Sequence, residues 1–148
     1  MKKLTMIFAV LALMAGTSVF ANTGDKLSKA VKAEFQKSFS GAENVTWEID
    51  EEFYFASFEL NEKRVDAAYD EKGTLVGLSR KLQLSAVPLT VSQSLQSAYP
   101  DYVIGNTVTE VVYEGQTFYY ANAAGATWIL KLKCFPDGQI YVEKKTKK

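Results

Sequence analysis

Phe53-Tyr54-Phe55-Ala56 is the stretch that decides the fold, because it returns 65 positions later as Phe118-Tyr119-Tyr120-Ala121. Two glycines keep the same offset: Gly73 and Gly138 each stand in a short turn sequence between apolar runs. A similarity that holds its spacing over this distance indicates an internal repeat, in which each copy is one supersecondary unit. We therefore expect two copies of the same unit along the chain.

An amphipathic helix opens each copy. Apolar residues recur at every fourth position, which places them on one face of a helix and leaves the charged residues on the other faces. These apolar residues are Leu27, Val31, Phe35 and Phe39 in the first copy and Val87, Val91, Leu95 and Tyr99 in the second. Pro88 suits the first turn of the second helix, and Pro100 ends it.

Four runs of alternating apolar and polar residues follow each helix, as expected for half-buried strands. They cover residues 45–49, 53–60, 64–69 and 74–84 in the first copy, and 107–113, 117–123, 127–135 and 139–143 in the second. Short charged or glycine-containing turns separate them, which favours antiparallel neighbours. The predicted class is α+β: a tandem repeat of a helix plus four antiparallel strands, forming a sheet of about eight strands with two helices on one face.

Residues 1–21 have the three parts of a cleavable secretory signal. Lys2 and Lys3 supply the positive charge, an apolar run follows, and Val19-Phe20-Ala21 ends in a small residue at the expected cleavage point. The apolar run is shorter than the roughly 20 residues that a spanning helix needs. We therefore expect a periplasmic or secreted protein without a stable membrane anchor.

The mature chain, residues 22–148, is expected to form a single domain made of two repeats, at about 25–85 and 86–145. The full chain has 17 basic and 17 acidic residues, so removal of Lys2 and Lys3 leaves 15 against 17. This balance gives no strong field that would attract nucleic acid or an anionic membrane, so we expect neither as a partner.

Few residues of this chain are suited to catalysis. Cys134 is the only cysteine, which rules out an internal disulfide, and its place on the apolar side of an alternating strand predicts a buried thiol. The chain has no histidine, the usual general base and the commonest metal ligand, and no glycine-rich phosphate loop. We therefore expect no catalytic residues, no metal site, no cofactor and no enzymatic activity.

Two acidic turns leave one enzymatic alternative open. Residues 50–52 and 70–71 are contiguous carboxylates between strands, which is typical of solvated turns. An enzyme that works with a pair of carboxylates remains a hypothesis, because the separation of such a pair in space is what defines it. Asp70 and Glu71 are the best candidates for that role.

Alternation along the strands predicts which side chains face away from the helices. In the second strand of each copy, Tyr54, Ala56, Tyr119 and Ala121 are assigned to the helix side. The residues left for the open face are Phe53, Phe55, Phe118 and Tyr120, flanked by Glu59, Asp66, Lys131 and Lys133. Aromatic anchors within a charged surround are typical of a protein-binding patch. The alternative is that loops, sheet curvature or a neighbouring subunit cover these rings.

Several short stretches follow one another in a characteristic order along the chain. They are Ala42-Glu43-Asn44-Val45-Thr46-Trp47-Glu48, Phe53-Tyr54-Phe55-Ala56-Ser57-Phe58, Ala68-Tyr69-Asp70-Glu71-Lys72-Gly73-Thr74-Leu75, Val87-Pro88 and Ala98-Tyr99-Pro100-Asp101-Tyr102. Their order resembles the PepSY-like periplasmic protein family, whose fold is related to that of the β-lactamase-inhibitor proteins. The resemblance implies a tandem helix-plus-sheet module with no catalytic residues, associated with inhibition or regulation of peptidases in the cell envelope. It also implies target binding across an open sheet face.

Our leading hypothesis is a non-catalytic exported protein that binds another envelope protein, a peptidase or other hydrolase, through its open sheet face. It would act as an inhibitor or regulator of that hydrolase. The alternative is a small-ligand-binding or envelope-sensor module with an apolar cleft between the two repeats.

Overall fold

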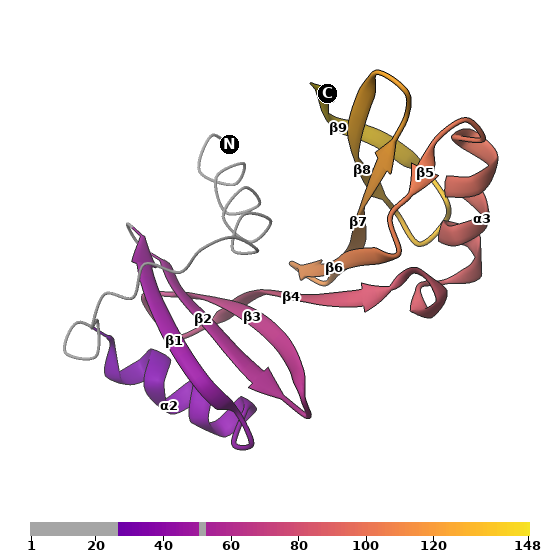
Figure 1. Cartoon of the computed structure of the whole chain (residues 1–148). Coiled ribbons are helices and arrows are strands. Elements are labelled where there is room, and N and C mark those ends of the chain that lie inside the picture. Colours follow the sequence, from indigo (N-terminus) through magenta and orange to yellow (C-terminus); the bar gives the residue numbers. More distant parts are fainter. Residues whose placement is uncertain (1–26, 51–52) are drawn as a thin grey trace. The chain divides into compact units, whose positions relative to one another are not determined.

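The computed structural model describes residues 27–50 and 53–148, and the chain divides into two compact units after Arg80 (Figure 1). The predicted secretory signal at residues 1–21 lies outside the described residues. Neither described helix has the length and apolar character that a membrane crossing needs. The two units are described separately below, as the first unit (to Arg80) and the second unit (from Lys81).

The described residues form two α-helices and nine strands of antiparallel sheet, which confirms the predicted α+β class with a sheet of about eight strands. The helices are α2 (Lys29–Ser38) and α3 (Leu89–Ala98), and a short 3-10 helix, Leu84–Ala86, precedes α3. The strands are β1 (Glu43–Asp50), β2 (Phe53–Leu60), β3 (Lys63–Asp70), β4 (Leu75–Gln83), β5 (Val103–Ile104), β6 (Thr107–Tyr113), β7 (Gln116–Ala124), β8 (Trp128–Cys134) and β9 (Ile140–Lys147).

In the first unit, α2 packs on one face of the antiparallel strands β1, β2, β3 and β4 (Figure 1). The core between helix and sheet is mainly aromatic. The Phe35 ring lies 5.0 Å from Phe58 and 5.1 Å from Trp47, both edge-on, which is a favoured arrangement of aromatic rings. Ala56 and Phe58 belong to this core, as alternation along β2 predicts.

In the second unit, α3 packs in the same way on β6, β7, β8 and β9. Its core is mainly aliphatic: Val91 and Leu95 of the helix meet Ala121, Leu132 and Cys134 of the strands. The prediction that the Cys134 thiol is buried is confirmed. Burial raises the pKa of this thiol to about 11, so it stays protonated at neutral pH.

Glycine closes the corresponding turn in each unit. Gly73 follows β3 with φ +86°, Gly138 follows β8 with φ +90°, and each N–H donates to the carbonyl three residues earlier. A side chain at Gly73 would place Cβ only 2.9 Å from the backbone carbonyl of Ala30 in α2. The turn therefore needs glycine both for its backbone conformation and for its close approach to the helix.

The first strand of each unit departs from the predicted pattern. In the first unit, β1 begins two residues early and contains an irregularity next to Asn44, whose φ is +52°. In the second unit the chain forms two strands here, β5 and β6, interrupted at Gly105, whose N–H donates to the Asn122 carbonyl. The sequence analysis missed β5 because a two-residue strand shows no alternation.

Candidate binding surfaces

The eight residues predicted for the open face all lie on the strand faces opposite the helices. Phe53, Phe55 and Glu59 belong to β2, and Asp66 belongs to β3. In the second unit, Phe118 and Tyr120 belong to β7, and Lys131 and Lys133 to β8. Their neighbours along each strand are the residues of the two cores, so alternation assigned the faces correctly.

The exposure expected for the four rings is wrong for three of them. Only 2% of Phe55, 2% of Phe118 and 7% of Tyr120 is accessible to solvent, and Phe53 is half-buried. The alternative, that these rings are covered, therefore describes Phe55, Phe118 and Tyr120. Alternation reports the side to which a residue points, but it carries no information about what lies over it.

In the second unit, part of the cover comes from lysines of the neighbouring strand. The Lys133 ammonium lies 4.3 Å from the centre of the Phe118 ring, and Lys131 lies 4.9 Å from that of Tyr120. Long lysine side chains lay their methylene groups along apolar surface and keep the charged end in water. An ammonium over an aromatic face also gains a cation–π attraction of about 0.5–1 kcal/mol at exposed sites.

Two further aromatic residues extend this arrangement, and the sequence analysis did not select them. Phe135 lies 5.9 Å from Phe118, and Tyr141 lies 5.8 Å from Phe135. Tyr141 pairs with Lys133 across β8 and β9, so both side chains share one face, and 55% of Tyr141 is exposed. Extending the alternation into the last strand from its turn would have found Tyr141. We call the set Phe118, Tyr120, Lys131, Lys133, Phe135 and Tyr141 the lysine–aromatic surface.

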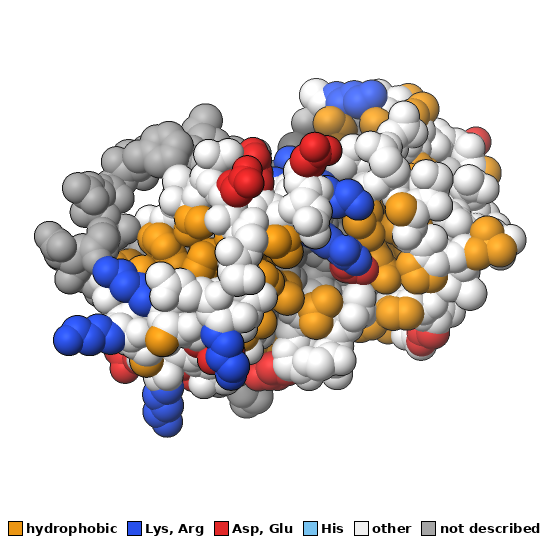
Figure 2. Space-filling model, turned by 90° about the horizontal axis from the view of Figure 1, so that it is seen from below, with side chains coloured by type: hydrophobic (Ala, Val, Ile, Leu, Met, Phe, Trp, Pro, Cys, Tyr) orange, Lys and Arg blue, Asp and Glu red, His pale blue; other side chains and the backbone are white. Residues whose placement is uncertain are grey.

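An acidic residue of β9 stands close to the same surface. Burial, with a smaller effect from the negative charge of Glu143, raises the pKa of Tyr120 to about 12. The phenol is therefore neutral at physiological pH and contributes as an aromatic ring and a hydrogen-bonding group. The charges that the surface offers to a partner at that pH come from its lysines and from Glu143. The face of the molecule drawn in Figure 2 shows hydrophobic side chains among basic and acidic ones.

On the corresponding face of the first unit, polar side chains lie next to Phe53 and Phe55. The Ser57 hydroxyl donates to Asp66 at 2.6 Å, and Arg64 Nε lies 3.6 Å from the same carboxylate. Ser57 of β2 and Ser79 of β4 lie on either side of Asp66, because each pairs with it across the strands, and both serines are buried. Asp66 is thus held in a local network of hydrogen bonds and an ion pair. Glu59 of the same face accepts a hydrogen bond from the Asn44 amide, near the start of β1.

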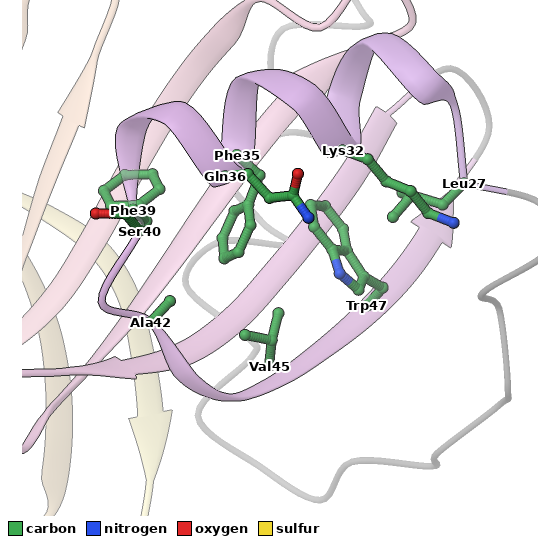
Figure 3. Close-up of a pocket in the computed structure, with 9 residues that line it drawn as sticks. All are labelled: Leu27, Lys32, Phe35, Gln36, Phe39, Ser40, Ala42, Val45 and Trp47. Atoms are coloured by element: carbon green, nitrogen blue, oxygen red, sulfur yellow. The ribbon is translucent and has the colours of Figure 1, made fainter.

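A pocket lies within the first unit, between α2 and β1 (Figure 3). Its volume is about 540 Å³, within the range typical of small-molecule sites. We call it the α2–β1 pocket, and its lining residues are Leu27, Lys32, Phe35, Gln36, Phe39, Ser40, Ala42, Val45 and Trp47. Aromatic rings form its walls, and the polar side chains all come from α2 or from the residues just after it. It differs from the expected cleft between the repeats, because it lies inside one unit.

Asp70, one of the two carboxylates that the sequence offered for catalysis, has a structural use in its turn. Asp70 Oδ1 accepts hydrogen bonds from the backbone N–H groups of Lys72 at 3.0 Å and Thr74 at 2.8 Å. Asp137 bonds to the N–H of Gln139 in the equivalent turn of the second unit. Within residues 27–50 and 53–148, no group of three or more His, Cys, Asp or Glu side chains could hold a metal ion.

Solved structures with the same fold come from species of Bacteroides. The chain is similar to a DUF2874 family protein from Bacteroides uniformis ATCC 8492, with a TM-score of 0.70 and 21% identity over 82% of this chain and 89% of that chain. It is also similar to a BLIP-like protein from Bacteroides fragilis NCTC 9343, with a TM-score of 0.69 and 18% identity over 82% and 87%. A third structure, from Bacteroides eggerthii DSM 20697, is described as "putative periplasmic proteins". It matches with a TM-score of 0.69 and 18% identity over 80% of this chain and 87% of that chain.

These similarities establish the fold. The BLIP-like neighbour supports the part of the resemblance that concerns the fold of the β-lactamase-inhibitor proteins. The PepSY-like name is not among the names of these neighbours. The chain matches no protein-family model, and it matches no curated protein.

Proposed function

We propose that this chain is a non-catalytic protein, exported to the periplasm, that binds another envelope protein through the lysine–aromatic surface of its second unit. The observation that carries the proposal is the continuous set of edge-to-face rings and lysines that ends in the exposed Tyr141. The names of the neighbours agree with it: one is called BLIP-like and another periplasmic.

The lysine–aromatic surface has the composition that protein interfaces favour. Tyrosine supplies a large contact area with few rotatable bonds, and residues of this kind form the anchors of most measured interfaces. Tyr141 is 55% exposed and leans against Phe135, so its ring is already partly held in place before a partner arrives. A rigid anchor loses little entropy on binding, which favours affinity.

The finer form of the proposal is that the partner is an envelope hydrolase, which the chain inhibits or regulates. It rests on the resemblance to the PepSY-like family and on the fold shared with a BLIP-like protein. The lysines favour a partner whose contact region carries carboxylates, because complementary charge speeds association and selects against basic partners.

Variants at the exposed end of the surface test this proposal. Phe55 and Tyr120 are unsuitable because both are buried, and a serine there would leave a cavity. Tyr141→Ala and Lys133→Ala should reduce the recovery of a specific periplasmic protein by about tenfold, a loss that corresponds to about 1.4 kcal/mol of binding free energy. Recovery is measured by affinity capture from a periplasmic fraction and quantitative mass spectrometry.

Leu89→Ala provides the matched control. Leu89 is an exposed apolar residue of the same unit, 69% accessible, but it lies on α3. The control variant should recover the partner as well as the unchanged chain does. The proposal is wrong if Leu89→Ala and Tyr141→Ala reduce recovery equally, or if neither changes it while all three chains remain folded by circular dichroism.

A further inference from the structure

We propose that the α2–β1 pocket binds a small molecule built of one aromatic ring and a carboxylate. This site goes beyond the protein-binding function proposed above. It belongs to the other unit of the chain and lies on the helix side of its sheet, so neither proposal depends on the other.

The walls of the pocket favour a flat ring. Phe35 lies 5.6 Å from Phe39 and 5.1 Å from Trp47, so one helix residue joins two further rings along the wall. Figure 3 shows the Phe35 and Trp47 rings bordering the same space, with Val45 and Ala42 below them. An aromatic ligand in this space can meet the surrounding rings edge-on or offset, which adds about 0.5–1.5 kcal/mol per pair beyond the burial of area.

The internal repeat indicates what size of ring the place next to Ala42 can take. Ala42 and Tyr102 occupy the same position after their helices: the Ala42 N–H donates to the Phe39 carbonyl at 3.0 Å, and the Tyr102 N–H donates to the Tyr99 carbonyl at 3.1 Å. In the second unit the Tyr102 ring packs edge-on against Tyr99, with centroids 5.7 Å apart. In the first unit this position carries only a methyl group, and that methyl group lines the pocket.

A second pair of equivalent residues supports the same comparison. Gly125 makes room for the tyrosine ring, because a Cβ at Gly125 would lie 2.7 Å from Tyr102 Cε1. Leu60 stands at the equivalent position of the first unit, beside Gly41, and it is not part of the pocket lining. The second unit thus covers its helix end with its own phenol ring, and the first unit leaves an open apolar pocket along Phe39, Phe35 and Trp47.

A polar stripe along α2 indicates the carboxylate. Lys32 and Gln36 are four residues apart and therefore share one side of α2, along the pocket, and Ser40 lines the pocket just after the helix ends. Figure 3 shows the Gln36 amide over the gap between Phe35 and Trp47, and the Lys32 side chain directed toward Leu27. The equivalent residues of the second unit are Ser92, Gln96 and Pro100, which carry no charge. Of these equivalent positions, only the one in the first unit carries a cationic group, the Lys32 ammonium. A cationic group beside the pocket favours an anionic ligand.

Three small phenols, one anionic, one neutral and without the side chain, and one cationic, test the proposal on the unchanged mature chain. These probes are 3-(4-hydroxyphenyl)propionate, p-cresol and tyramine, and binding is measured by two-dimensional NMR of the indole N–H signals. The propionate should shift the Trp47 signal in a saturable way and leave Trp128 unchanged. p-Cresol should bind more weakly, and tyramine at least about tenfold more weakly than the propionate.

Two variants check the site. Lys32→Gln should remove the preference for the propionate over tyramine, whereas Lys37→Gln, an exposed lysine of the same helix outside the pocket, should keep it. The double variant Ala42→Tyr with Leu60→Gly copies the residue pair of the second unit and should abolish the Trp47 shift. Its folding is checked by the remaining amide signals, and Gln36→Ala offers a second, milder variant should the double variant unfold.

The proposal is overturned if the propionate gives no saturable shift of the Trp47 signal at millimolar concentration. It is also overturned if Lys32→Gln keeps the preference for the propionate over tyramine and Gln36→Ala leaves the Trp47 shift unchanged. Equal binding of all three phenols would exclude the carboxylate part. None of these outcomes affects the capture of a protein by the second unit, so failure here is distinguishable from failure of the proposed function.

Discussion

Tyr69 places a polar hydroxyl group inside the core of the first unit. Its side chain is fully buried among Phe35 and Trp47, and its hydroxyl has no hydrogen-bond partner among the described residues. A buried hydroxyl without a partner costs about 1–3 kcal/mol in proteins. The equivalent residue of the second unit is Cys134, a side chain with little need for a partner.

Tyr69→Phe should therefore leave the free energy of unfolding unchanged or raise it by about 1 kcal/mol, because the ring is kept and only the unpaired hydroxyl is removed. Urea denaturation followed by tryptophan fluorescence measures the difference. Val65→Ala, in the same strand, is the control for a simple loss of packing and should destabilise. A decrease of more than about 1 kcal/mol in Tyr69→Phe would mean that the hydroxyl has a stabilising partner.

Three buried acids predict how stability depends on alkaline pH. Burial, with a smaller effect from Glu34, raises the pKa of Tyr69 from 10.0 to about 12. The pKa of Tyr120 is also raised to about 12, and burial raises the pKa of the Cys134 thiol from 9.0 to about 11. The folded chain therefore holds these protons more tightly than the unfolded chain does. Their contribution is fully present below pH 9 and is lost as the pH rises through the folded values.

The free energy of unfolding should accordingly fall between about pH 9 and pH 12. Urea denaturation at several pH values measures this slope. Tyr69→Phe should make the slope shallower above pH 10 and leave the region between pH 9 and pH 10 unchanged. Stability that is constant to pH 12 in the unchanged chain would show that the three groups titrate normally when folded.

At the scale of the elements, the two units reach the same arrangement with different side chains. The first fills its core with Phe35, Phe58 and Tyr69, where the second has Leu95, Ala123 and Cys134. Conversely, the small Ala67 in the first core corresponds, 65 positions later, to the larger Leu132 in the second core. Leu132 therefore offsets part of the side-chain volume that the second core lacks at the other three positions.

The turn between β3 and β4 allows a sharp test of this packing. Gly73→Ala should destabilise by more than about 2 kcal/mol, because alanine disfavours a positive φ by about 1–2 kcal/mol and its Cβ would also press on the Ala30 carbonyl. Gly115→Ala is the matched control: its φ is +76°, and nothing lies within 4 Å of its added Cβ. Thermal or urea denaturation compares the two.

Gly115→Ala should show the backbone penalty alone, about 1–2 kcal/mol. Equal losses in the two variants would mean that the turn moves away from α2 without cost. A larger loss in Gly115→Ala would contradict the contact between Gly73 and the helix.

The helices and most strands were predictable because their signals are local. The fourfold spacing of Val31 and Phe35 matches α2, and the alternation from Thr74 to Leu84 matches β4 within a residue at each end. The break at Gly105 and the irregularity near Asn44 were not predictable, because a single residue with an unusual backbone leaves no periodic signal.

The candidate sites were predictable only in part. The side on which Phe118 and Tyr120 lie follows from alternation, but their cover by lysine side chains depends on rotamers and on the register between β7 and β8. The α2–β1 pocket was missed altogether. Its lining combines a helix face with residues of β1, and only the packing of the two reveals the space between Ala42 and Trp47.

At the scale of the whole chain, each unit has a hydrophobic core drawn from its own residues. Val31 is fully buried in the first core and Val91 in the second, at equivalent positions of α2 and α3. Val31→Ala and Val91→Ala therefore remove the same two methyl groups from two separate places. Each should lower the free energy of unfolding by about 2 kcal/mol.

The effect of each substitution should be strongest in its own unit. Hydrogen exchange of the full mature chain, read by mass spectrometry of peptides, should accelerate mainly before Arg80 in Val31→Ala and mainly after Lys81 in Val91→Ala. The reason is that local opening follows the contacts that are lost, and those contacts stay within one core. Equal acceleration of both units by either substitution would instead mean that the two cores open as one cooperative structure.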